Sequence, residues 1–153
     1  MLRARIALRS GRLVVAGWLA LHSAFASAVE YRAVGVDAAI LYDAPSRKAR
    51  KLFILGRQYP VEVLVALEGW IKVRDAAGDL AWIESNQLDA RRMLLVRVPR
   101  AQVREQPEES APIAFEVEQD VVLELLETVG NFARVRHADS GVGYVRITQV
   151  WGL

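Results

Sequence analysis

Residues able to carry out catalysis are scarce in this chain of 153 residues. It contains no cysteine and two histidines, His22 and His137. A catalytic nucleophile or base needs a partner that holds and activates it, and the sequence shows no H-E-x-x-H, G-x-S-x-G, phosphate-loop or dinucleotide-binding pattern. Glu108 and Glu109 are adjacent acids in a segment predicted to be a solvated loop. We therefore expect no enzyme activity, no metal site and no cofactor.

A basic cluster is the most concentrated charge feature of the chain. Its members are Arg47, Lys48, Arg50 and Lys51. Such a cluster can contact an anionic cell-wall polymer or lipid headgroups through its positive field. The alternative is a loop whose charges are simply solvated.

The first 28 residues have the layout of a secretory signal peptide. Four arginines precede an apolar run from Leu13 to Phe25, and Ala26-Ser27-Ala28 places small residues before a cut between Ala28 and Val29. The alternative is an uncleaved anchor, but the run is shorter than the ~20 residues that a membrane-spanning helix needs. We expect a periplasmic or secreted protein with no stable membrane span after cleavage.

Removal of this segment reverses the sign of the net charge. The whole chain has 20 basic and 18 acidic residues. Because four arginines and no acid lie in residues 1–28, the remainder holds 16 basic and 18 acidic residues, a net charge of −2. A basic nucleic-acid-binding protein is therefore not expected. Without cysteine the exported chain has no disulfide, so its stability must come from burial alone.

The chain repeats itself at an interval of 62 residues. The ungapped match runs from Leu41–Leu88 onto Val103–Val150. Identical pairs include Pro45 with Pro107, Phe53 with Phe115, Glu62 with Glu124 and Gln87 with Gln149. Aromatic and aliphatic positions stay in phase throughout the match. An internal repeat of this kind indicates two homologous structural units.

Each unit shows the alternation of apolar and polar residues that is typical of half-buried strands. In the first unit the expected strands include 59–65, 70–74 and 80–84, separated by turns at 68–69 and 76–79. In the second they are 121–126, 132–136 and 142–146, with turns at 129–131 and 139–141. Five short strands in about 60 residues are the size of a small closed barrel, which hides most strand edges.

Aromatic residues of the first unit are further candidates for ligand contact. Trp70 and Trp82 alternate with polar neighbours and match Phe132 and Tyr144, so we predict that they belong to the core. Tyr42 has no aromatic counterpart in the second unit and is the better ligand candidate. The complete set of candidate ligand-binding residues is Tyr42, Tyr59, Arg47, Lys48, Arg50 and Lys51.

Both units resemble the bacterial SH3 (SH3b) family. The motifs that carry the resemblance in unit one are Pro45, Gly69-Trp70, Val73 and Ala81-Trp82-Ile83. In unit two they are Val103-Arg104, Pro107, Asn131-Phe132, Val135-Arg136 and Gly143-Tyr144-Val145. The resemblance implies an all-β protein of two tandem small SH3-like β-barrels after an N-terminal signal peptide, with domains at 34–88 and 94–153 and a linker at 89–93.

The stretch Ile40–Ser46 also resembles the start of eukaryotic SH3 domains, whose groove binds proline-rich peptides. That groove needs adjacent aromatic side chains with slots between them. Here Ala44 stands where a second tyrosine is required, and Ile71 follows Trp70 in place of a second tryptophan. Tyr42 also departs from the SH3b turn, which carries an arginine. We therefore do not expect proline-peptide recognition.

The resemblance implies a non-catalytic exported module that binds a cell-wall peptide, a glycan or a protein partner of the envelope. The alternative is a structural protein of an envelope complex, with Val121-Val122-Leu123 and Trp151 as its interface. An envelope hydrolase is the third class, and it conflicts with the absent cysteine and the unpartnered His137.

Overall fold

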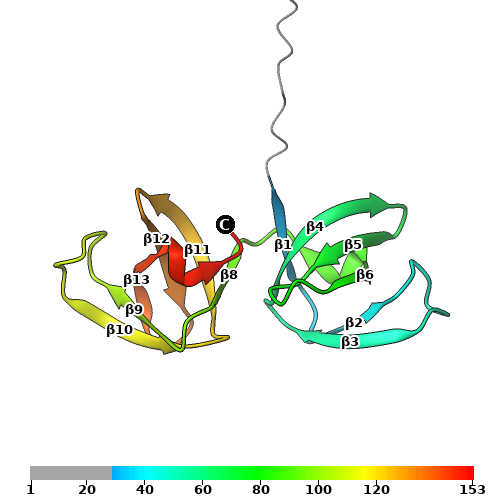
Figure 1. The fold of residues 1–153 in the computed structure, drawn as a ribbon, viewed down its shortest axis with the longest axis horizontal. Coiled ribbons are helices and arrows are strands. Elements are labelled where there is room, and N and C mark those ends of the chain that lie inside the picture. The colour runs from blue at the N-terminus through cyan, green and yellow to red at the C-terminus, as the bar shows by residue number, and fades with distance from the viewer. Residues whose placement is uncertain (1–28) are drawn as a thin grey trace, which may run out of the picture.

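The computed structural model describes residues 29–153, which form an almost entirely β structure (Figure 1). The predicted signal peptide, including Ala28 at the expected cut, lies outside the described residues. Val29 is the first of them, and its side chain is 54% exposed. In the part of the chain that is described, no helix combines the length and the apolar character needed to cross a membrane.

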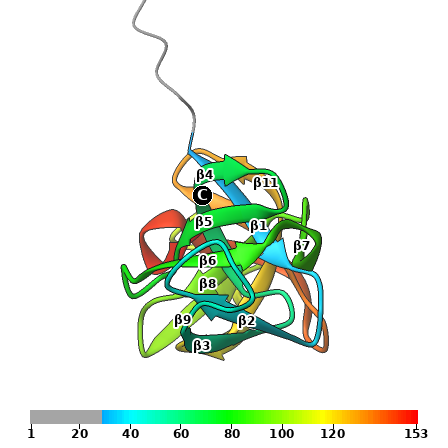
Figure 2. The ribbon, with the colours of Figure 1, turned by 90° about the vertical axis from the view of Figure 1, so that its right-hand side faces the viewer.

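Unit one is a seven-stranded antiparallel sheet with the strand order β3-β2-β6-β5-β4-β1-β7. Its strands are β1 (Glu30–Val34), β2 (Ala38–Tyr42), β3 (Lys51–Gly56), β4 (Pro60–Leu67), β5 (Trp70–Arg74), β6 (Leu80–Glu84) and β7 (Leu88–Asp89). A short 3-10 helix, η1 (Ser85–Gln87), joins the last two. Figure 2 looks onto this unit, with β4 and β5 above and the β2–β3 hairpin below.

Unit two repeats the arrangement with the order β10-β9-β13-β12-β11-β8-β14. Its strands are β8 (Met93–Val96), β9 (Arg100–Arg104), β10 (Ile113–Glu118), β11 (Val122–Val129), β12 (Phe132–His137), β13 (Gly141–Arg146) and β14 (Val150–Trp151), with η2 (Ile147–Gln149) before the last. The prediction of an all-β chain with two tandem, similar units is therefore confirmed.

The structural repeat is longer than the repeat seen in the sequence, because it includes β1 with β8 and β7 with β14. Each sheet therefore has seven strands, where the alternation pattern predicted five. Irregular features recur at the same interval. The β2–β3 pair has a bulge after Leu41 and the β9–β10 pair has one at the same level. Gln58 and Asp120 both have positive φ, at 68° and 65°.

The core of each unit consists of the side chains that point inward from its strands. In unit one the buried cluster is Val34, Ala39, Leu41, Leu55, Val61, Ile71, Val73, Ala81 and Ile83. In unit two it is Leu94, Val96, Ala101, Val103, Val117, Leu123, Ala133, Val135 and Val145. These side chains are aliphatic and largely β-branched, which suits packing on a pleated sheet.

The prediction that Trp70 and Trp82 belong to the core is wrong. Both are half-buried and lie outside the buried cluster of unit one. Successive residues of a strand point to opposite faces, and here the inward set on β5 is Ile71 and Val73. Alternation shows that a strand has two faces, but it does not say which face is inward when both carry large apolar residues.

The two units pack on each other through β8, a strand that the sequence repeat did not include. On β8, Leu94 and Val96 belong to the core of unit two, whereas Met93 and Leu95 point the other way and are 4% and 1% exposed. β8 lies against β4 of unit one, and β8 is on the side of unit two that faces unit one (Figure 1). One face of β8 thus packs in the core of unit two, and its other face packs between the two units.

An aromatic contact extends this interface at the C-terminus. The ring of Tyr31 meets the ring of Trp151 edge-on, with centroids 5.1 Å apart and an interplanar angle of 86°. The Arg92 guanidinium lies 5.8 Å from the centroid of Tyr31 and donates a 3.0 Å hydrogen bond to the Gly152 carbonyl. Leu123 lies in the core of unit two. Two residues expected to form an external interface, Leu123 and Trp151, are therefore used inside the chain.

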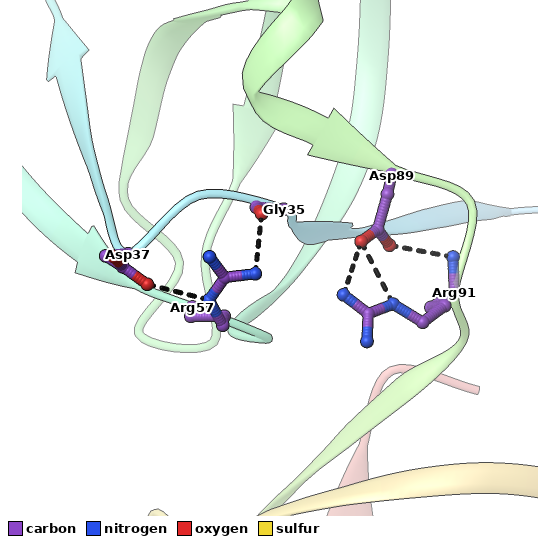
Figure 3. Close-up of polar contacts among 5 residues, drawn as sticks. All are labelled: Gly35, Asp37, Arg57, Asp89 and Arg91. Atoms are coloured by element: carbon purple, nitrogen blue, oxygen red, sulfur yellow. Dashed lines mark hydrogen bonds and ion pairs between the residues drawn. The ribbon is translucent and has the colours of Figure 1, made fainter.

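Ion pairs brace the segments on either side of this junction (Figure 3). Arg57 donates to the Gly35 carbonyl at 3.0 Å and to Asp37 Oδ1 at 2.8 Å. Asp89 accepts hydrogen bonds from Arg91 Nε and Nη2 at 3.0 and 2.7 Å. These hydrogen bonds from Arg91 lower the pKa of the Asp89 carboxyl. The residues that follow β7 are thus held in a bent path.

Candidate ligand-binding groove

A groove of about 650 Å³ opens at one end of unit one. It lies between the β2–β3 loop, the β4–β5 turn and the start of η1. We call it the unit-one groove, and its lining residues are Pro45, Ser46, Arg47, Lys48, Gly69, Trp70, Glu84, Ser85 and Asn86. Three segments distant in the sequence therefore contribute to one site.

The β2–β3 loop is folded by hydrogen bonds of its own. The Asp43 amide donates to the Arg50 carbonyl at 3.1 Å, and the Arg50 amide donates back to Asp43 Oδ1 at 3.1 Å. Inside the loop, the Ala49 amide donates to the Ser46 carbonyl at 3.0 Å and the Lys48 amide to Ser46 Oγ at 3.2 Å. Short polar side chains commonly form such turns with nearby backbone. The loop therefore presents its basic side chains from a defined backbone.

Trp70 forms the aromatic wall of the groove. It follows the two-residue turn Glu68-Gly69, where Gly69 has a φ of +77° that favours glycine. Tyr42 supports it from below, with an edge-to-face contact at 5.4 Å between centroids and 86° between planes. Tyr42 is only 6% exposed. Edge-to-face pairs of this kind are favourable, so the wall is held in place while part of its ring stays open.

An ion pair closes the other side of the groove. Arg47 donates to Glu84 Oε2 from Nε at 3.0 Å and from Nη2 at 2.5 Å. The Glu84 side chain is 14% exposed and that of Arg47 is 74% exposed, so the acid lies at the base and the arginine at the rim. The hydrogen bond to Glu84 raises the pKa of Arg47. Within residues 29–153 Lys48 has no ion-pair partner, and it supplies an uncompensated positive charge at the rim.

The structure brings together three of the six candidate residues. Arg47 and Lys48 line the groove, and Tyr42 lies beneath its wall. Arg50 is turned outward and pairs with Asp43 at 3.3 Å. Lys51 is exposed at the start of β3. These two are close in sequence to the groove but do not line it.

Tyr59 belongs to a different part of the unit. It is half-buried against the core at the turn between β3 and β4. Burial raises the pKa of its hydroxyl, and a hydrogen bond with the backbone of Ala76 opposes that shift. Its role in the fold is therefore to cover the end of the core away from the groove.

Sequence reasoning missed Glu84, Ser85 and Asn86 and assigned Trp70 to the core. One signal for Glu84 was present in the repeat. Arg47 and Glu84 correspond to Glu109 and Arg146, so both charges are reversed together. A reciprocal reversal at two positions of a repeat indicates that the two side chains are in contact.

Unit two has a different arrangement at the equivalent place. Phe132 stands where unit one has Trp70, and it is only 6% exposed. Arg104 stands where unit one has Tyr42, and its Nη1 donates a 2.7 Å hydrogen bond to the Ala111 carbonyl across the base of the loop. Arg104 is thus a structural link within unit two. At the same position in unit one, Tyr42 instead supports the aromatic wall.

His137 is not part of the groove. Its Nδ1 is 3.0 Å from Ser140 Oγ, and its ring is 6.2 Å from that of Phe115. Across residues 29–153 no group of three or more potential ligand side chains is arranged to hold a metal ion.

The comparisons with known proteins concern both units. The family model described as the bacterial SH3 domain matches residues 35–90 and again 97–152. No protein in the curated set matches the chain.

Several solved structures match the chain at low similarity. NlpC2 from Trichomonas vaginalis is 18% identical, with a TM-score of 0.38, over 81% of this chain and 48% of that chain. An NlpC/P60 family protein from Bacillus cereus is 17% identical, with a TM-score of 0.37, over 80% and 56%. A structure described as "Endolysin LysPBC5 CBD" is 13% identical, with a TM-score of 0.31, over 80% and 91%.

The chain spans about half the length of the two NlpC-type chains. The family assignment depends on the repeated family match, which covers well over half of the sequence. Because the family model matches both units, this chain belongs to the bacterial SH3 domain family.

Proposed function

We propose that this protein is a non-catalytic, exported binding module that holds a cell-wall peptide or glycan in the unit-one groove. The observation that carries the proposal is the open face of Trp70 next to the uncompensated charge of Lys48. An aromatic face binds the apolar side of a sugar ring or a peptide segment. A neighbouring cation selects carboxylate-bearing ligands, which are common in cell-wall peptides.

The remaining lining residues fit the same class of ligand. Ser46, Ser85 and Asn86 offer hydroxyl and amide groups that form hydrogen bonds with a polar chain. The Arg47–Glu84 pair neutralises its own charges, so Lys48 sets the sign of the groove. Ligand sites typically combine an apolar surface with a few placed polar groups. An extended anionic peptide or glycan satisfies all of these features.

The experiment is co-sedimentation of residues 29–153 with purified cell-wall sacculi. Lys48→Gln removes the groove cation, and Arg97→Gln is its matched control. Arg97 is also an exposed cation with no ion-pair partner among residues 29–153, but it lies in unit two and away from the groove. We expect saturable binding that Lys48→Gln weakens about tenfold, the effect of losing one charge-assisted hydrogen bond, and that Arg97→Gln leaves unchanged.

A second variant tests the aromatic wall. Trp70→Leu keeps an apolar side chain over Tyr42 but removes the flat ring, and we expect it to abolish sedimentation with sacculi while the unit stays folded. Equal loss with Lys48→Gln and Arg97→Gln would reject the groove in favour of bulk electrostatics. The absence of any binding by the unmodified chain would reject the cell-wall ligand.

The proposed lack of catalysis has its own test. Incubation of the pure protein with soluble cell-wall peptides should release no product, and turnover that disappears with His137→Ala would contradict the proposal.

A further inference from the structure

The outer surface of unit one carries two tryptophan rings on neighbouring strands. Residues of a strand alternate between faces, so Trp70 and Lys72 point outward from β5 while the alternate residues belong to the core. On β6, Trp82 lies directly opposite Lys72, and Glu84 lies opposite Trp70. Trp70 and Trp82 are therefore diagonal neighbours on one face, and such positions in an antiparallel pair are about 7–8 Å apart.

Lys72 places a positive charge between the two rings. Its Nζ lies 5.9 Å from the centroid of the Trp82 ring, close to the ~6 Å limit of a cation–π contact. The Lys72 side chain is half-buried, and it has no ion-pair partner among residues 29–153. The charge is therefore held beside the ring without being neutralised.

The same positions of unit two are arranged differently. Arg134 stands in the place of Lys72, but its Nη1 is 3.1 Å from Glu127 Oε1. Unit one has Val65 at the position of Glu127, and the Val65 side chain is 44% exposed. The cation on this face is thus free in unit one, whereas its counterpart in unit two is neutralised.

The backbone of this surface is not available to a ligand. β5 is paired with β4 and β6, and β6 is paired with β5 and β2; Figure 2 shows β4, β5 and β6 side by side. A peptide that adds to a sheet needs a free strand edge, and neither β5 nor β6 offers one. Recognition here must therefore come from side chains, which are two flat aromatic rings and one cation. Flat rings suit the apolar faces of sugars, and the cation suits a carboxylate.

We propose that Lys72 and Trp82 form a second subsite beside the unit-one groove, and that the ligand of both is a glycan strand carrying carboxylate groups. This inference rests on the proposed function and narrows its ligand from a peptide or glycan to a glycan. Trp70 belongs to both sites, because it lines the groove and lies diagonally across from Trp82. Sugar rings of one strand lie on the two tryptophans, with its carboxylates beside Lys48 and Lys72.

Calorimetric titration of residues 29–153 with two soluble fractions of the cell wall tests the ligand class. An amidase separates the glycan strands from their peptides and leaves a free carboxylate on each sugar that carried a peptide. The peptide-free strands should bind saturably. Failure of these strands to bind would overturn the inference, and the groove proposal would stand if the released peptides or intact sacculi still bound. Absence of binding to all three would reject both proposals.

Two substitutions test the subsite, each with a control at the equivalent position of unit two. Lys72→Gln and Trp82→Leu should each weaken binding of the glycan strands about tenfold, the scale of one charge-assisted hydrogen bond or one aromatic contact. Arg134→Gln and Tyr144→Leu should leave the affinity unchanged. Unchanged binding by either Lys72→Gln or Trp82→Leu, while Lys48→Gln still weakens it, would reject the subsite and keep the groove.

Two further checks guard against misfolding and against a general charge effect. Circular dichroism shows whether Trp82→Leu folds, since Trp82 is half-buried. If it does not fold, Lys72→Glu takes its place, because it keeps both rings and reverses the charge, and it should weaken binding more than Lys72→Gln does. A loss with Arg134→Gln equal to that with Lys72→Gln would reject the subsite in favour of net charge.

Discussion

Arg47 and Glu84 form an ion pair in unit one, at 2.5 Å between Nη2 and Oε2, that recurs in unit two with its charges exchanged. There Glu109 and Arg146 occupy the same two positions and form the same contact. Both units thus have an ion pair at these two positions, although the acid and the base have exchanged places. In unit one the pair holds the β2–β3 loop against the end of β6, and in unit two it holds the β9–β10 loop against the end of β13. The sign of the charge on the loop therefore differs between the units.

Exchange of the charges in unit one is the first prediction. Arg47→Glu places two carboxylates together, so the loop should lift from the strand and sacculus binding should fall. Glu84→Arg added to it should restore the contact, as in unit two. Hydrogen exchange of the Ala49 and Arg50 amides, which bond inside the loop, should accelerate in the single variant and return to normal in the double. A double variant as perturbed as the single would show that the contact does not order the loop.

The contact between units gives the second prediction. Leu95 is 1% exposed and faces unit one, so Leu95→Ala should destabilise the protein by about 2–5 kcal/mol, the usual cost of a buried leucine cavity. In urea, Leu95→Ala should unfold in two separate transitions, one for each unit, because the contact that couples the units is weakened. Leu94→Ala is the control, since Leu94 lies in the core of unit two and its loss should lower only the transition of that unit. Unchanged urea unfolding of Leu95→Ala would contradict the interface.

The third prediction concerns alkaline pH. Burial raises the pKa of Tyr31 above its ordinary value of 10.0, and the negative charge of Glu62 adds to the shift. The folded state thus keeps the proton where the unfolded state releases it. This contribution is fully present below about pH 10 and is lost as pH rises through the folded pKa.

Tyr31→Phe keeps the ring against Trp151 and removes the ionisable group. Urea unfolding at several pH values above 9 should show a smaller loss of stability in Tyr31→Phe than in the unmodified chain. Tyr59→Phe gives the contribution of the second buried hydroxyl, whose pKa is also raised by burial. Identical pH profiles for the unmodified chain and Tyr31→Phe would show that Tyr31 is not desolvated in solution.

The fourth prediction is that the exported protein begins at Val29. The mass of the intact protein recovered from the periplasm or medium should correspond to residues 29–153. Ala28→Arg places a large charged residue where small residues are needed for cleavage and should leave the precursor uncut. A native protein that retains residues 1–28 would make the segment an anchor.

Much of the architecture could be predicted from local patterns. Alternation along Trp70-Ile71-Lys72-Val73-Arg74 specifies a strand because side chains alternate between faces. The repeat at an interval of 62 residues specified two similar units, since two stretches with the same apolar phase bury the same positions. Basic residues near Pro45 pointed to a charged loop, and two of the four, Arg47 and Lys48, line the groove.

By itself, the sequence determined that the chain is an all-β tandem of homologous units without cysteine. Only the tertiary structure decided that Trp70 faces outward, that Arg47 reaches Glu84 across 37 residues, and that Met93 and Leu95 turn toward unit one. The reason is physical. Alternation is a property of neighbouring residues, whereas the inward face of a strand, the partner of a charge and the docking of two sheets depend on which distant segments the closed fold places side by side.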